Sequence, residues 1–152
     1  MGLFDEIDIK ASRVAARNIL QRVIMLSRIA DVKLETLKSP LISNMPKSVN
    51  QTNSLESRII NQLGRRVEAQ SELKQIIDAV YKLDIEARVI IYYSYFETNK
   101  KKDFEIAELI YHNLCSLRTM QNKRDKALLE FCEYYKHGEL LVFRSQNHIV
   151  TG

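Results

Sequence analysis

A single stripe of apolar side chains runs through the segment from Ser54 to Leu83. Its members recur mostly three and four residues apart, and they are Leu55, Ile59, Leu63, Val67, Leu73, Ile76, Ile77 and Val80. This spacing puts them on one face of an α-helix, for which Ser54 is a suitable N-cap. At 1.5 Å per residue the helix would be roughly 45 Å long. A helix of that length needs a partner, which is either the first helix of the chain or a helix of a second chain.

The rest of the chain also favours helices over strands, because its 152 residues include only four glycines and two prolines. Apolar periodicity predicts a first helix over about 12–31. Both prolines and many Ser, Thr and Asn residues fall within 38–53, which we predict to be an irregular connector. Asp84 is a suitable cap for a third helix over 85–96, whose apolar and aromatic side chains place it in the core. We therefore expect an all-α protein.

Two more helices are predicted between Asp103 and Tyr135. A short one over 104–110 would be capped by Asp103, and a long one would run from Ser116 to about His137, with Gly138 in the left-handed conformation that ends helices. The inward stripe of the long helix is Met120, Ala127, Leu128, Phe131 and Tyr135. A short supporting helix, a tight turn and a second helix with one buried stripe are the parts of a helix-turn-helix. The segment 140–143 that follows is either a short strand or an apolar tail folded on the core.

The outward face of the last long helix is polar and rich in cations. It carries Arg118, Gln121, Asn122 and Asp125, flanked by Thr119, Lys123, Arg124 and Lys126. Arg, Gln and Asn side chains can pair with base edges, and Lys and Arg neutralise phosphates. The alternative is that this is the solvated face of an ordinary amphipathic helix.

Other classes of function find little support in the sequence. The net charge of +4 is compatible with a polyanionic partner. The three histidines lack metal-ligand spacing, and no phosphate-binding loop or hydrolase motif is present, so we expect neither an enzyme nor a metal or cofactor site. Cys115 and Cys132 are interpreted as buried, reduced thiols. The chain lacks a secretory signal and a stretch long enough to span a bilayer, so we expect a cytoplasmic protein without membrane contact.

Several short motifs carry a resemblance to known families. Glu105-Ile-Ala-Glu and the stretch Ser116–Leu128 resemble the helix-turn-helix of the domain by which bacterial sigma factors read the upstream promoter element. The whole chain resembles the ArpU family of phage-encoded transcriptional regulators, which is related to the RinA type of late-gene activators. The motifs that carry this second resemblance are, in order, Phe4–Asp8, Ser39–Pro46, Ile76-Ile77 with Leu83, Arg88–Tyr93 and Phe131–Phe143.

The resemblance implies a sequence-specific regulator of a phage or prophage late operon that binds double-stranded DNA. Its sigma-type pattern places Leu117, Arg118, Thr119, Gln121 and Asn122 at DNA-facing positions, with Lys126 near the DNA backbone. From the residues themselves, Lys123, Arg124 and Lys126 would neutralise phosphates. The sequence departs from the pattern in three places, the turn 111–115, Leu117 at an often polar position, and the lead-in 100–102.

The expected organisation is an N-terminal helical pair followed by a sigma-like helix-turn-helix domain. Its segments are an N-terminal helix (1–37), the connector (38–53), the long helix (54–83), the helix-turn-helix domain (84–143) and a tail (144–152). Because one helix-turn-helix buries little surface, useful affinity would need a homodimer or contact with RNA polymerase, with the long helix as the candidate surface. The main alternative is a helical adaptor that binds RNA polymerase or another phage protein without reading bases. A structural coiled-coil protein is a more distant one.

Overall fold

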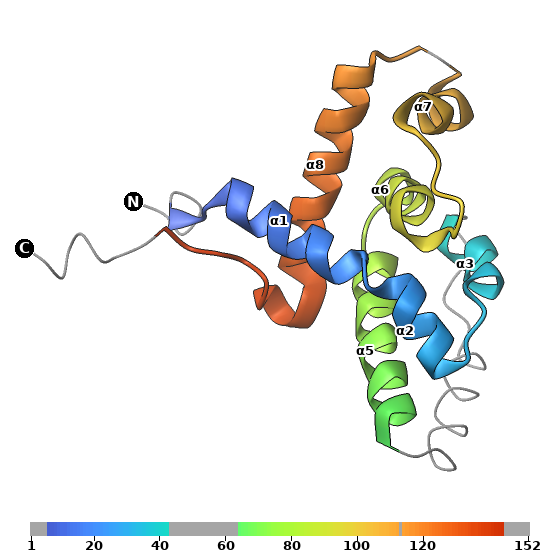
Figure 1. Ribbon diagram of the computed structural model, residues 1–152. Coiled ribbons are helices and arrows are strands. Elements are labelled where there is room, and N and C mark those ends of the chain that lie inside the picture. The colour runs from blue at the N-terminus through green and yellow to red at the C-terminus, as the bar shows by residue number, and fades with distance from the viewer. Residues whose placement is uncertain (1–5, 43–63, 113, 145–152) are drawn as a thin grey trace, which may run out of the picture.

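The computed structural model describes residues 6–42, 64–112 and 114–144. Within these ranges the chain is all-α, as expected, and its only β-type pairing is an isolated antiparallel bridge between Ile7 and Phe143. The helices are α1 (Ile9–Leu20), α2 (Val23–Ala30), α3 (Lys38–Ile42), α5 (Gly64–Tyr81), α6 (Ile85–Ile91), α7 (Asp103–Tyr111) and α8 (Leu117–Tyr134) (Figure 1). The described residues also include the 3₁₀ turns η2 (Leu34–Leu37) and η4 (Tyr135–Gly138) and the π-helical turn η3 (Tyr92–Phe96). No helix in the described ranges is long and apolar enough to cross a membrane.

The single helix predicted over 12–31 is wrong, because the structure divides it into α1 and α2. Asp8 begins α1 earlier than predicted, since its carboxylate accepts a hydrogen bond from the Ala11 N–H at 3.0 Å. At the break, the Arg22 N–H donates a hydrogen bond of 3.1 Å to the Ile19 carbonyl, three residues earlier in the chain. The change of direction lets α1 pack against α8 while α2 packs against α5.

The partner of the long helix α5 is α2 of the same chain. The buried stripe of α5 includes Leu73, Ile76, Ile77 and Val80, as predicted. Polar contacts fix the pair, because Arg66 bonds Asp31 at 2.8 Å and Arg22 bonds Glu72 at 2.8 Å. The buried Gln70 amide also donates to the Ala30 carbonyl at 3.1 Å. A second chain is therefore not needed to cover the described part of this stripe.

The connector predicted over 38–53 is wrong at its start, where residues 38–42 form helix α3. This short helix packs against α6, and Leu41 is buried there. Burial of Leu41 stabilises a helical turn that the nearby proline does not exclude, because Pro40 lies in its first turn. The rest of the connector and the predicted N-cap Ser54 lie outside the described residues, as does 145–152.

The third helix matches its prediction. Asp84 caps it by accepting a hydrogen bond from the Ala87 N–H at 2.8 Å, and the helix continues through η3 to Phe96. The tyrosines at 92, 93 and 95 are buried with Phe96, so they belong to the core.

Helix α8 packs against α1 on one side and against α6 and α7 on another (Figure 1). The segment after η4 returns to α1, where the Asp8 N–H donates to the Val142 carbonyl at 2.7 Å. Leu140 and Leu141 pack on the core while Val142 and Phe143 remain exposed, so the segment 140–143 is an apolar tail with one bridge. One hydrophobic core runs from Ala16 of α1 to Tyr135, across the domain boundary predicted at 83.

Candidate nucleic-acid interface

Helices α7 and α8 and the turn between them occupy the predicted helix-turn-helix segment. The cap predicted at Asp103 is wrong, because Asp103 is already the first residue of α7 and Lys102 is its N-cap. The Lys102 N–H donates to the Glu105 carboxylate at 3.0 Å. The Asp103 carboxylate is instead bonded to Arg124. His112, in the left-handed conformation (φ 51°), ends α7. Ser116 caps α8 by accepting a hydrogen bond from the Thr119 N–H at 3.1 Å.

The predicted inward stripe of α8 is confirmed. Met120, Ala127, Leu128, Phe131 and Tyr135 are all buried. The Phe131 and Tyr135 rings stack with centroids 5.4 Å apart. Ile106 and Ala107 of α7 are buried in the same core, so the two helices are packed together rather than merely adjacent.

The first turns of α8 carry a continuous exposed surface, which we name the reading face. It consists of Leu117, Arg118, Thr119, Gln121 and Asn122, all of which are exposed. The Arg118 guanidinium has no partner among the described residues. Figure 1 shows this end of α8 projecting from the body of the molecule beside α7. The five DNA-facing positions expected from the sequence therefore share one accessible surface.

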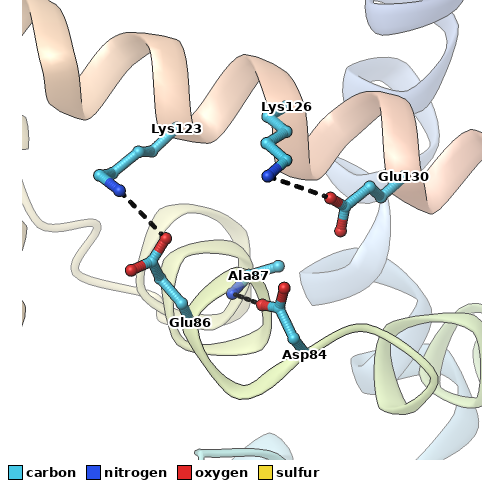
Figure 2. A network of polar contacts seen from close by, with 6 residues as sticks. All are labelled: Asp84, Glu86, Ala87, Lys123, Lys126 and Glu130. Atoms are coloured by element: carbon cyan, nitrogen blue, oxygen red, sulfur yellow. Dashed lines mark hydrogen bonds and ion pairs between the residues drawn. The ribbon is translucent and has the colours of Figure 1, made fainter.

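Lys123 contacts α6 and α7. Its Nζ lies 3.2 Å from a Glu86 carboxylate oxygen and 5.1 Å from the centre of the Tyr111 ring (Figure 2). Burial, and then the nearby Glu86 carboxylate, raises the pKa of the Tyr111 phenol above its usual range. Lys123 is thus held by an ion pair and a cation–π contact within the chain.

Lys126 projects from the same side of α8 as Lys123 but is more exposed (Figure 2). Its Nζ is 4.0 Å from the Glu130 carboxylate one turn later, yet 77% of its side chain is exposed (Figure 2). Burial, followed by the Asp84 carboxylate, raises the pKa of Glu130. An exposed pair at this distance costs little to separate, so Lys126 remains available to another anion.

Arg124 is the most enclosed cation of α8, with only 17% of its side chain exposed. Its guanidinium bonds the Asp103 carboxylate at the start of α7, and its Nε donates to the Ser94 hydroxyl of η3 at 3.2 Å. Arg124 therefore ties α8 to both neighbouring elements. The sequence predicts phosphate contacts for Lys123 and Arg124 and gives no sign of these internal contacts, because the hydrogen-bonding partners lie 21 to 37 residues away.

Comparison with known proteins identifies the family. The chain is 32% identical over 144 residues to a protein of Enterococcus hirae named "Putative autolysin regulatory protein ArpU", and the match covers 95% of this chain and all of that protein. The chain belongs to the ArpU family. No family model matches the sequence, and no solved structure matches it.

Both cysteines of this ArpU-family protein lie within the described residues. No three His, Cys, Asp or Glu side chains come together there in a way that could hold a metal ion. Cys115 and Cys132 are free thiols, the first half-buried and the second fully buried. The Cys132 thiol donates to the Ser12 carbonyl at 3.0 Å, and burial raises its pKa to about 11.

Proposed function

We propose that this ArpU-family protein regulates transcription by binding double-stranded DNA through the reading face of α8. The observation that carries the proposal is the contrast between the two sides of this helix. One side is anchored in the core by Met120, Leu128 and Phe131, while the first turns present exposed side chains of the types that pair with bases. The name of the E. hirae relative, a regulatory protein, supports a regulatory role.

Each side chain of the reading face has a chemical role in this proposal. Arg118 would donate two hydrogen bonds to a guanine edge, and Gln121 and Asn122 would pair with adenine edges. Leu117 is apolar where a polar residue is common, and it would contact the methyl group of a thymine. The Ser116-capped end of α8 carries the positive end of the helix dipole, which favours a nearby phosphate. Lys126 would neutralise a further phosphate.

Lys123 and Arg124 take a different role in the proposed function. Both have partners within the chain, so we assign them to holding α8 at a fixed angle to α6 and α7 rather than to phosphate contacts. A recognition helix that enters the major groove must be oriented before binding, because reorienting it would cost affinity.

The biological setting that we propose is a phage or prophage late operon. A single helix-turn-helix buries little surface, so useful affinity would come from a second copy of the chain or from RNA polymerase. The apolar stripe of α5 is already covered by α2, so a partner that binds α5 would use its exposed polar side chains, such as Glu68, Ser71 and Gln75.

One observation favours the adaptor alternative. Large apolar side chains are exposed around α7, namely Phe104, Leu109 and Leu114, the last at 87% exposure. Exposed apolar side chains of this size are suited to a protein partner. An adaptor that binds through this surface would not need the polar residues of the reading face.

The deciding experiment measures binding of the purified protein to DNA flanking its own gene, beside the double variant R118A/Q121A. We expect a footprint for the wild type and an affinity lower by at least about 30-fold for the variant, since base contacts contribute about 1–3 kcal/mol each. The control is R28A, which removes an arginine from an exposed position on α2. Equal, sequence-independent binding by all three proteins would refute base reading by α8.

A further inference from the structure

A groove of about 280 Å³ lies directly beside the reading face. Four parts of the chain form its walls, and one of them is η3 with Ser94 and Tyr95. The other three contribute Arg17 and Gln21 from α1, Lys100 and Lys101 from the segment before α7, and Gln121 and Arg124 from α8. Gln121 therefore belongs both to the reading face and to the groove, which makes the two surfaces continuous.

Helix α1 is fixed in the orientation that forms this groove. Arg13 of α1 bonds Asp125 of α8 at 3.5 Å, one turn beyond Gln121. Arg13, Arg17 and Gln21 are four residues apart, so they follow one face of α1 toward its C-terminal end. Because Arg13 is tied to α8, Arg17 is presented to the groove one turn further along.

The groove has a surplus of positive charge. Its lining includes four cations, Arg17, Lys100, Lys101 and Arg124, and two carboxylates, Asp103 and Asp125. Both carboxylates are already paired within the chain, Asp103 with Arg124 and Asp125 with Arg13. Lys101 is 3.6 Å from Glu97. Arg17 and Lys100 have no ion-pair partner among the described residues, and they carry the free charge of the groove.

We propose that this groove binds backbone phosphates of the DNA whose bases contact the reading face, so that α1 is part of the DNA interface. The inference rests on the proposed function and extends it beyond the helix-turn-helix. A helix in the major groove is flanked by the two phosphate strands, and phosphate contacts fix its register. The groove lies on such a flank. Its free cations sit on long side chains, which suit a continuous polyanion.

The test compares the double variant R17A/K100A with the wild type in DNA binding at several salt concentrations. Two lost phosphate contacts should reduce the slope of log affinity against log salt by about 1.8, at about 0.9 per contact. Affinity should fall by the same factor on the specific site and on random DNA, because phosphates carry no sequence information. Ethylation interference should lose its signal at one or two phosphates in the variant.

The matched control is R28A/K82A, which removes an arginine and a lysine from exposed positions on α2 and after α5. Its salt slope should equal that of the wild type, and thermal melts should show both variants folded. If the wild type binds its site selectively and R17A/K100A keeps the full slope, the groove assignment fails alone. If R17A/K100A loses binding to RNA polymerase while its DNA binding is unchanged, the groove is a protein surface. If the wild type shows no DNA binding, the proposed function fails with it.

Discussion

Arg118 and Arg124 are the same residue type six positions apart on one helix, and the structure gives them opposite surroundings. Arg118 is exposed and has no partner among the described residues, whereas Arg124 is enclosed and bonded to Asp103 and Ser94. A cation taken out of water needs a partner to offset its lost hydration. Residue type and helical position therefore do not fix the role of a basic side chain on α8. The distribution of acidic residues on neighbouring elements does.

The Arg124–Asp103 pair can be tested by a double-mutant cycle of R124A, D103A and the double variant. We expect a coupling of about 1 kcal/mol in the free energy of unfolding, because the pair is partly enclosed and its hydrogen bond is charge-assisted. R124A should also weaken DNA binding by loosening α8, but it should leave the salt slope unchanged. Chemical denaturation and salt titration give the two readouts. A slope lowered by about 0.9 with unchanged stability would show instead that Arg124 contacts a phosphate.

At the scale of the helix, the sequence predicted the ends that depend on local chemistry. Asp84 and Ser116 cap their helices as expected. The helix end predicted at His137 is wrong, because α8 ends at Tyr134 and both Lys136 and His137 have a left-handed backbone. Gly138 is left-handed as predicted, with φ of 86°, but it lies in the turn after α8. The break between α1 and α2 could not be predicted, because no glycine or proline marks it and only packing against α8 and α5 requires it. Asp103 was misassigned as a cap for a similar reason, since Arg124 lies 21 residues away.

Gly138 offers a test of the turn that follows α8. A Cβ at this position would lie 3.2 Å from the Leu141 Cδ1 atom, and the backbone φ of 86° is strained for any L side chain. We expect G138A to lower the free energy of unfolding by about 1–2 kcal/mol, measured by denaturant titration. G138N should cost less, because asparagine tolerates left-handed backbone better than alanine. Equal stability of wild type and G138A would mean that the turn after α8 relaxes freely.

At the scale of the whole molecule, α1 joins the N-terminal half to the last long helix. Ser12 of α1 accepts hydrogen bonds from the Cys132 thiol, through its carbonyl, and from the Val142 N–H, through its hydroxyl, at 3.0 and 2.8 Å. The sequence predicted an all-α chain and the buried stripe of α8, since both follow from periodicity. It did not predict that α1 packs on α8 or that basic residues of α1 border the reading face. Contacts between residues far apart in the sequence do not alter the local spacing of apolar and basic residues.

The junction of α1 and α8 should make the whole fold sensitive to alkaline pH. Burial raises the pKa of the Cys132 thiol from an ordinary value of 9.0 to about 11. Between these values the unfolded chain releases the thiol proton while the folded chain keeps it, so the free energy of unfolding falls as pH rises. The loss approaches about 1.4 kcal/mol per pH unit for one group. Tyr92, whose pKa rises from 10.0 to about 12, adds to the loss at higher pH.

The variant C132A separates the thiol from the tyrosines. It should be less stable than the wild type at pH 8, because it removes the fully buried sulfur atom that packs between α1 and α8. From pH 9 to pH 10, however, its free energy of unfolding should fall less steeply than that of the wild type, since the thiol titrates before the tyrosines do. Denaturant titrations at half-unit pH steps measure both slopes. Parallel slopes in this window would mean that Cys132 titrates alike in the folded and unfolded chain, and that burial at the contact between α1 and α8 does not raise its pKa.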